Sequence, residues 1–362
     1  MRLEGFRDGR LVQGLAGRIR SAAGGRRFRF MEVCGTHTTA MFRHGLRELL
    51  GGAVDLLSGP GCPVCVTPNG YLDRAIEIGR RHRTLIATFG DMVRVPGSES
   101  SLERERAAGL DVVIVYSPLD ALAIASENGG RPVVFLGVGF ETTAPLVASS
   151  IVEAERQGIS NYYVLSSHKR IPPALKVLAL DPEIKVDGFI LPGHVSVIIG
   201  SLAYETVVRD FRIPCVVTGF EPLDMVDGIY RLVRQCVEGR AEVEIAYARA
   251  VTRQGNRKAQ GLLDEIFQVE DAEWRGIGPI PESGYGIAGR YAHRDAALAF
   301  PVSVDPPRDH PGCLCGEVLK GKVLPAECSL FAGTCTPETP VGPCMVSSEG
   351  TCAAHYKYGR KA

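Results

Sequence analysis

The sequence lacks an excess of charge of either sign, a long hydrophobic run and a signal segment. Lysine plus arginine and aspartate plus glutamate both number 41 in 362 residues, so no overall field favours nucleic acid or an anionic membrane. No stretch approaches the ~18 apolar residues of a membrane span, and the charged start MRLEGFRDGRLVQGLAGRIR has no apolar signal core. We therefore expect a cytoplasmic protein that binds neither nucleic acid nor membrane.

Fingerprints of nucleotide binding are also missing. The segment Gly137–Glu141, GVGFE, follows a late strand candidate and has no third glycine of a dinucleotide fingerprint. No GxxxxGK[ST] segment for nucleotide phosphates occurs in the chain. The sequence therefore argues against a nicotinamide or P-loop enzyme.

Cysteine, in contrast, is abundant and unevenly distributed. In a reducing compartment, eleven cysteines indicate metal or redox chemistry before structural disulfides. Three lie within the first 65 residues, and six crowd between Cys313 and Cys352. We expect two separate cysteine sites, with the isolated Cys215 and Cys236 packing as small buried hydrophobes.

The fold is predicted from short apolar runs that alternate with amphipathic stretches between about residues 28 and 240, a pattern typical of βα units on parallel sheets. The expected strands are Arg27–Val33, Ala53–Ser58, Thr84–Phe89, Val112–Tyr116, Val133–Val138, Tyr162–Ser166, Gly188–Leu191 and Pro214–Thr218. We predict an α/β domain at 1–140, a second at 141–240 and a C-terminal cysteine-rich domain at 241–362, mostly helical or irregular. Within the last, Asn256–Gln268 reads as a helix and Gly276–Pro307 as irregular structure or a linker.

The first cysteine site contains the pair Cys62-Pro-Val-Cys65, which follows a strand candidate and precedes a helix predicted to be capped by Thr67, with Pro68 at its first position. A helix N-terminus favours thiolate, and this spacing permits either disulfide exchange or shared metal binding. The pair also fits half of a structural zinc site.

A thiol and an imidazole join this site, because Met31-Glu-Val-Cys34-Gly-Thr-His37 ends the first strand at the same sheet edge. A nucleophile and base of protease or acyltransferase type would leave Cys62 and Cys65 without a role. Taken alone, His37 is more often a hydrogen-bonding residue than a ligand.

Other polar residues follow strands at the edge where α/β sheets bind ligands. Asp91, Glu141, His168 and His194 all occupy such positions. Each residue alone also fits capping or turn chemistry. Their shared placement predicts a common cleft.

The second cysteine site begins at Cys313-Leu-Cys315 and continues through widely spaced cysteines. Thiolates in this number suit tetrahedral zinc or a [4Fe–4S] cluster. The absence of the paired knuckles of zinc ribbons favours iron and sulfur. The expected ligands are Cys328, Cys335, Cys344 and Cys352, with Cys313 or Cys315 as a possible substitute for one of them.

Several segments together resemble the HypD family of hydrogenase maturation proteins: MEVCGTHT, GPGCPVCVTP, FGDMVRVPG, GFETTAP, LPGHVS and PVGPCMVSSEGTCAAHYKYG. They occur in this order, begin at residue 31 and reach the C-terminal region. The resemblance implies two α/β domains flanking a cleft, and a C-terminal domain that binds a [4Fe–4S] cluster through the four cysteines just named.

The same resemblance implies a scaffold on which the Fe(CN)2CO unit of [NiFe]-hydrogenase is assembled. A small HypC-type chaperone would dock, and HypE would deliver cyanide that HypF supplies upstream. Cys34, Cys62 and Cys65 would be the cleft thiols that bind this iron transiently, with Cys62 and Cys65 also cycling between dithiol and disulfide. Hydrogen bonds or protons would come from His37, Asp91, Glu141 and His194.

Two cysteine groups on one chain further suggest that the cluster is an internal electron relay for the Cys62–Cys65 pair. The main alternative is a disulfide oxidoreductase of thioredoxin type with a structural zinc tail. A purely structural adaptor with two zinc sites is the third interpretation.

Overall fold

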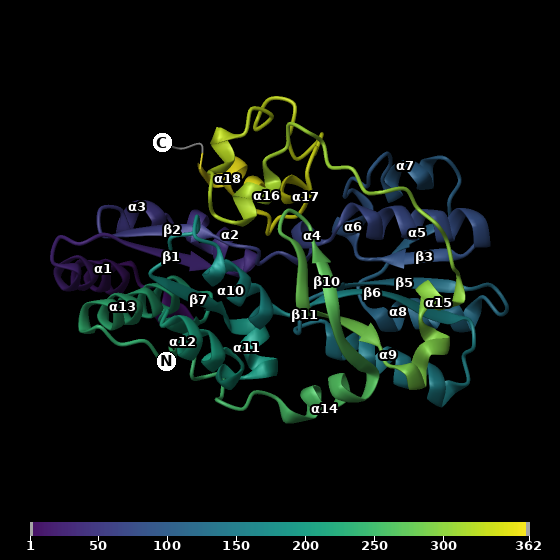
Figure 1. Cartoon of the computed structure of the whole chain (residues 1–362), viewed down its shortest axis with the longest axis horizontal. Coiled ribbons are helices and arrows are strands. Elements are labelled where there is room, and N and C mark those ends of the chain that lie inside the picture. The colour runs from purple at the N-terminus through teal and green to yellow at the C-terminus, as the bar shows by residue number, and fades with distance from the viewer. Residues whose placement is uncertain (1–2, 360–362) are drawn as a thin grey trace.

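The computed structural model describes residues 3–359, whose strands form two sheets (Figure 1). Sheet A has five parallel strands, in the order β2 (Val54–Ser58), β1 (Phe28–Glu32), β7 (Gly188–Pro192), β8 (Cys215–Thr218) and β9 (Val243–Ile245). Sheet B has six, in the order β10 (Phe267–Trp274), β11 (Gly278–Ile287), β6 (Tyr162–Lys169), β5 (Val133–Gly139), β3 (Leu85–Thr88) and β4 (Val112–Ile114). The predicted α/β class is confirmed, as are all eight predicted strands.

Helices cover both faces of each sheet, because alternate strand residues point into different apolar clusters. Sheet A packs on α1 (Gly9–Ala23), α3 (Leu46–Leu50) and α13 (Pro222–Glu238) on one face, and on α10 (Ile171–Leu180) and α12 (Glu205–Phe211) on the other. Sheet B packs on α8 (Pro118–Glu127), α9 (Ala144–Gln157) and α14 (Arg257–Ile266), and oppositely on α5 (Asn69–His82), α7 (Leu102–Ala107) and α15 (Ala296–Ala299). Before the cysteine-rich tail, the described 3-10 helices are η1 (Leu3–Arg7), η2 (Ser201–Tyr204) and η3 (Gly289–Arg294).

Each sheet draws its strands from both sides of the division expected at residue 140. Strands β1 and β2 pair in sheet A with β7 and β8, whereas β3, β4 and β5 pair in sheet B with β6. The chain therefore leaves sheet A, builds most of sheet B and returns, so that the predicted boundary falls at the end of β5. Strand pairing of this kind depends on long-range contacts that local patterns do not reveal.

The segment expected to be irregular after residue 276 also differs. Trp274 ends β10, and β11 returns antiparallel to it and joins β6, so this hairpin extends sheet B. The strand was missed because Gly278 and Pro279 stand at its first positions. Proline is tolerated there because it removes no hydrogen bond from the centre of the ladder. The expected helix over Asn256–Gln268 is confirmed as α14, with Asn256 as its cap.

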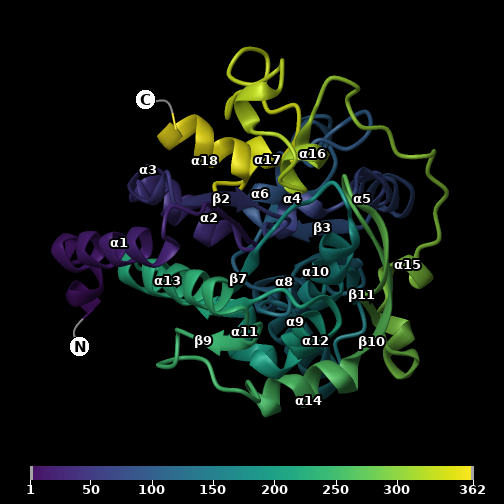
Figure 2. The same ribbon diagram turned by 60° about the vertical axis from the view of Figure 1, so that its left-hand side comes forward.

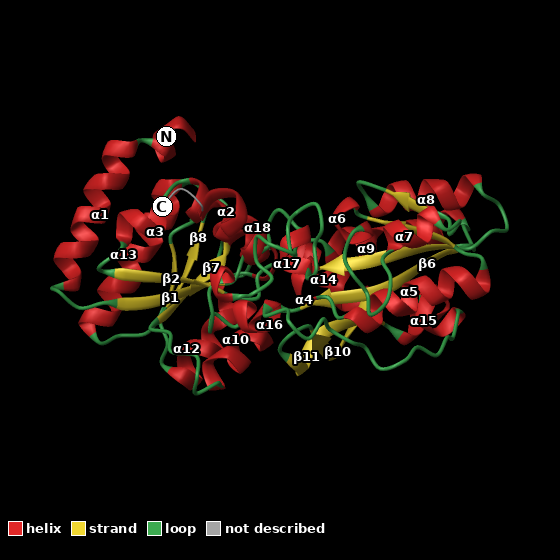
Figure 3. Ribbon diagram, turned by 90° about the horizontal axis from the view of Figure 1, so that it is seen from above, coloured by secondary structure: helices red, strands yellow, loops and turns green. Residues whose placement is uncertain are grey.

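The cysteine-rich tail lies across the junction of the two sheets, as Figures 1 and 2 show in yellow. Seen from above, it sits between the two groups of strands (Figure 3). It contains α16 (Cys315–Leu319), η4 (Pro325–Glu327), α17 (Pro343–Val346) and α18 (Thr351–Tyr358). Among residues 3–359, no helix has both the length and the apolar character that a membrane crossing requires.

Candidate functional site

Cys34 stands at the carboxyl end of β1, where it caps the helix α2 (Gly35–Arg43). The neighbouring turn after β2 packs directly on it, because the amide of Gly35 donates to the carbonyl of Gly61 over 2.9 Å. A Cβ atom on Gly61 would lie only 2.0 Å from the Cys34 nitrogen. Glycine at this position therefore allows the turns after β1 and β2 to meet.

We expect Gly61→Ala to lower the free energy of unfolding by about 3 kcal/mol, the upper range for overpacking, because the atoms it would strike are backbone. Urea denaturation measures this. The control is Gly17→Ala within α1, where no other described atom lies within 4 Å of the added Cβ. That change should be neutral or stabilising by up to about 1 kcal/mol, and an equal effect of both variants would contradict the close approach.

The Cys34 thiol is almost completely buried, with 7% of its surface exposed. Its pKa is raised to about 12, mainly by burial and also by the nearby carboxylates of Glu349 and Glu32, although the backbone amides of His37 and Thr36 oppose the shift. A protonated thiol is a poor ligand and nucleophile. The Cys34 thiol is therefore protonated at neutral pH in this structure.

A buried carboxyl group, which the sequence analysis did not single out, anchors Cys34. Glu32 accepts a hydrogen bond from the Cys34 amide at 3.1 Å and one from the Thr38 hydroxyl at 2.5 Å. Burial raises the pKa of Glu32 to about 7, although hydrogen bonds from Thr38 and Ser58 and the charge of Arg47 lower it. The alternation of residues along β1 places Glu32 on a buried face of the strand. This pattern is the feature of the sequence that could have identified Glu32.

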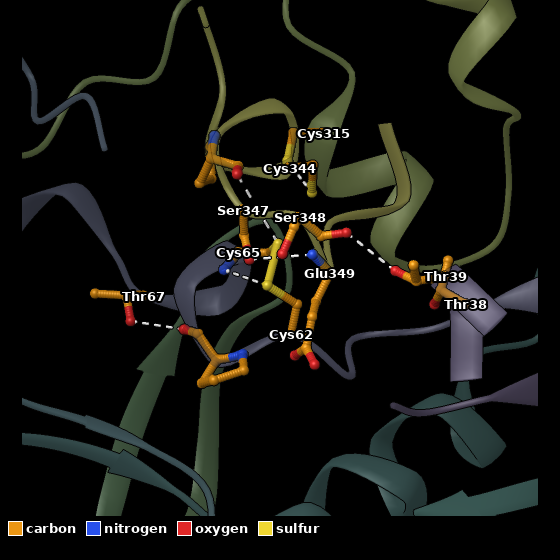
Figure 4. The surroundings of a disulfide bond; sticks show 12 residues. Thr38, Thr39, Cys62, Cys65, Thr67, Cys315, Cys344, Ser347, Ser348 and Glu349 are labelled. Atoms are coloured by element: carbon orange, nitrogen blue, oxygen red, sulfur yellow. Dashed lines mark hydrogen bonds between the residues drawn. A yellow bond between two sulfur atoms is a disulfide. The ribbon is translucent and has the colours of Figure 1, made fainter. Parts of the chain in front are cut away.

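The two sulfurs of the CxxC motif form a disulfide in this structure (Figure 4). Cys62 caps the single-turn helix α4 (Pro63–Val66), and its sulfur accepts from the Cys65 amide at 3.2 Å. The helix expected after Thr67 is α5, whose N-cap is Pro68, so Thr67 caps no helix start. Cys62 is 3% exposed and Cys65 is fully buried.

The imidazole of His37 is buried beside sheet A. Its Nε2 lies 2.9 Å from the Gly219 carbonyl and 2.9 Å from the Thr218 hydroxyl. Burial lowers the pKa of His37 to about 4, so the ring is neutral at physiological pH. Phe220 lies between His37 and the exposed His194, with ring centroids 4.7 and 3.9 Å away. His37 and His194, both predicted from the sequence, therefore pack on the same aromatic ring.

We expect the contribution of His37 to the free energy of unfolding to fall as the pH drops from about 6.5 to about 4, because the unfolded chain then protonates His37 while the folded protein does not. His37→Gln should flatten this dependence by up to ~3 kcal/mol. Urea unfolding of both proteins at several pH values measures it. Glu32 and Glu141, with pKa values raised to about 7, act oppositely by losing stabilisation as the pH rises between 4.5 and 7. Both proteins retain them, so parallel curves would contradict the prediction.

The remaining predicted polar residues follow or belong to strands of sheet B. Asp91 is exposed on α6 (Gly90–Val93) beside sheet B, and no described hydrogen bond joins its side chain to the thiols. Glu141 is buried and accepts from the Ile171 amide at 3.0 Å, at the start of α10. Burial raises the pKa of Glu141 to about 7. His168 is buried within β6, where it contacts Ser166.

All six tail cysteines line one small apolar cavity: Cys313, Cys315, Cys328, Cys335, Cys344 and Cys352. The Cys315 and Cys344 sulfurs lie 2.7 Å apart. Contacts with the thiols of Cys313 and Cys344 lower the pKa of Cys315. The structure therefore joins the four predicted ligands and both predicted substitutes in one place.

The tail also contacts the first cysteine site directly. The Cys65 sulfur lies 4.0 Å from the Pro343 carbonyl, one residue before Cys344. On the other side, the Thr36 hydroxyl donates to Glu349 at 2.6 Å (Glu349 is labelled in Figure 4). The sequence analysis missed Glu349, since the tail pattern gave no indication that it meets α2. The two cysteine groups thus form one continuous region at the junction of the sheets.

Comparison with known proteins identifies the family of the chain. Residues 10–359 match the family described as HypD: Hydrogenase formation hypA family. The chain is 46% identical to the hydrogenase maturation factor HypD of Cupriavidus necator, over 99% of this chain and 97% of the relative. It is also 46% identical to the HypD of Escherichia coli, over 92% and 90%, and 46% identical to the HypD2 of Bradyrhizobium diazoefficiens, over 98% and 96%. The resemblance predicted from the motifs is confirmed: the chain belongs to the HypD family of hydrogenase maturation factors.

Proposed function

We propose that this protein is the scaffold on which the Fe(CN)2CO unit of [NiFe]-hydrogenase is assembled. The observation that carries the proposal is the contact of the Cys62–Cys65 pair with the cysteine-rich tail, beside the buried thiol of Cys34. Low-spin iron with strong-field ligands suits soft thiolates. Cys34, Cys62 and Cys65 would hold this iron as cargo.

The tail cysteines fit a resident [4Fe–4S] cluster. Each iron of a cubane takes only one protein thiolate, so its ligands stand farther apart than those of one ion. Six thiols around one apolar cavity supply the required donors, and we assign Cys328, Cys335, Cys344 and Cys352 as the ligands.

A bound cluster would supply single electrons beside the CxxC pair. The protein's own contribution is the placement of the pair. The Cys65 amide donates to the Cys62 sulfur, and burial of both residues shields them from solvent. A dithiol opened there would be presented to iron next to Cys34.

Partners would reach this site from the surface beside Cys34. A cavity of about 300 Å³ lies there, lined by Thr36, Phe220, Glu349 and neighbouring basic residues. We propose that a HypC-type chaperone brings iron to this face and that HypE, supplied by HypF, delivers cyanide. His37 and His194 would stand on the wall of the site, where an imidazole N–H is able to donate to a cyanide nitrogen.

Burial argues against the thioredoxin-type alternative. A disulfide oxidoreductase must present its attacking sulfur to a protein substrate, but Cys62 is 3% exposed and Cys65 is fully buried. The tail covers them further.

The test is anaerobic purification, with iron, sulfide and zinc counted per chain and absorption recorded before and after dithionite. The proposal expects about four iron and four sulfide with a bleachable band. Infrared spectra of the protein isolated with its small chaperone should then show cyanide and carbonyl stretches. Stoichiometric zinc without sulfide, or a complex without these stretches, would overturn the scaffold.

A further inference from the structure

Arg275 is a buried cation in the turn between β10 and β11. Only 7% of its side chain is exposed. A charged side chain is costly to bury unless other groups pair with it or make use of its charge. Its surroundings therefore indicate what the charge does.

Three segments from distant parts of the chain hold this residue. The Arg275 amide donates to the Val66 carbonyl, at the end of the CxxC helix α4, over 2.9 Å. Its guanidinium donates to the Pro96 carbonyl at 3.4 Å and to the Asp309 carboxylate at 2.9 Å. Pro96 belongs to the segment FGDMVRVPG, and Asp309 lies in the stretch that leads from α15 into the tail. Arg275 is therefore fixed where sheet B meets the tail.

The tail thiols lie close to this residue. A Cβ on the adjacent Gly276 would lie only 2.3 Å from the residue that follows Cys315. Hydrogen bonds with the Cys313 and Cys344 thiols are the main causes that lower the pKa of Cys315, and burial opposes them. The positive charge of Arg275 lowers the same pKa further. The electric field of Arg275 therefore reaches the cavity that the tail cysteines line.

The ion pair of Arg275 with Asp309 is unevenly exposed. The side chain of Asp309 is 58% exposed, whereas that of Arg275 is 7% exposed. Water and salt screen an exposed charge more than a buried one. The pair therefore presents a net positive charge to the tail thiols.

We propose that Arg275 is a positioning residue for the cluster, whose buried charge offsets the negative charge of the cluster thiolates. The inference rests on the proposed function, because it takes the tail cysteines as the cluster site. Reduction adds an electron to a cluster that is already negative, so a nearby positive charge favours the reduced state and raises the reduction potential. Arg275 thus makes the cluster easier to reduce.

The experiment is a reductive titration of the anaerobically purified full-length protein, in which the absorption of the cluster is recorded at controlled potentials. In Arg275→Gln, we expect the ratio of reduced to oxidised cluster at the wild-type midpoint to fall at least tenfold, which equals about 59 mV for one electron. Arg275→Lys keeps the charge and should restore most of this ratio, although lysine lacks the planar fork. Arg104→Gln is the matched control, because the exposed Arg104 lines the same cavity of about 680 Å³ as Arg275 and should leave the ratio unchanged.

Asp309→Asn separates the effect of charge from that of packing. Asparagine keeps an acceptor oxygen for the guanidinium but removes the carboxylate charge that offsets it. We therefore expect the ratio of reduced to oxidised cluster to rise about threefold above that of the wild type, a smaller change because the carboxylate is partly screened. A role in packing alone would move both ratios in the same direction or leave them unchanged.

Two results would overturn the inference. One is an Arg275→Gln protein that retains its cluster with the wild-type midpoint. The other is an Asp309→Asn protein whose midpoint does not rise, and this variant decides the question if Arg275→Gln fails to fold or to hold iron. Failure of the proposed function looks different, because the wild-type protein itself would then contain no iron and sulfide.

Discussion

Cys344→Ser should abolish the iron–sulfur content of the purified protein and the maturation of hydrogenase in cells that depend on it. Cys344 is buried at the start of α17, and no water can replace its sulfur there. Loss of a supporting partner alone costs up to ~100-fold in metal affinity, so loss of a buried ligand should cost at least that much. Iron, sulfide and hydrogenase activity measured on the same cells test the prediction.

The matched control is Cys236→Ser on α13. Cys236 is half-buried, and its sulfur contacts the Asp187 carbonyl at 3.4 Å, away from both cysteine groups. This variant should keep full iron content and activity. If Cys344→Ser also kept four iron and sulfide, a different set of tail thiols would hold the cluster, with Cys315 as the adjacent replacement.

Local sequence patterns predicted eight of the eleven described strands but not their neighbours. Each of the eight expected strands is an apolar run bounded by turn residues, which is local information. The pairing of Phe30 with Gly188 joins segments far apart in the chain, so no window of sequence contains it. The missed β11 has exposed residues between its buried ones and begins with Gly278 and Pro279, which hid its alternation.

The candidate site could be predicted to the extent that it depends on residue type. Cysteine is a rare residue, so the clustering of cysteines in the sequence indicated both cysteine sites. Residues that act through packing, such as Gly61 against Cys34, or through a distant contact, such as Glu349 with Thr36, carry no such mark. Asp91 follows the end of β3 in sheet B and its side chain is exposed, so its role at the thiols stays a prediction.

The convergence of the two groups was foreseen only as a hypothesis. Their contact depends on α17 packing near α4 and on α18 packing against α2. Both α17 and α18 are short, and the loops of the tail have no periodic pattern. Tertiary packing, rather than propensity, places them.

Cys34→Ala should abolish hydrogenase maturation while leaving the [4Fe–4S] content unchanged. The Cys34 sulfur makes no side-chain capping bond within the described structure, so α2 keeps its N-terminal hydrogen bonds without it. Glu32 still holds the backbone of residue 34, and the tail ligands belong to other elements. The lost group is the thiol that would hold the incoming iron in the proposed function. Iron and sulfide counts, hydrogenase activity and cyanide or carbonyl infrared bands together test this.

The matched control is Cys215→Ala in β8, which removes an equally buried thiol from the same half of the molecule. Its sulfur contacts only the carbonyl of Ile213 among described hydrogen-bond partners, at 3.6 Å. Both variants should lose similar stability, about 1 kcal/mol, from the vacated volume, yet only Cys34→Ala should stop maturation. If both variants matured hydrogenase normally, iron would be held by Cys62 and Cys65 without Cys34. If both failed, the defect would arise from packing, and the chemistry assigned to Cys34 would be wrong.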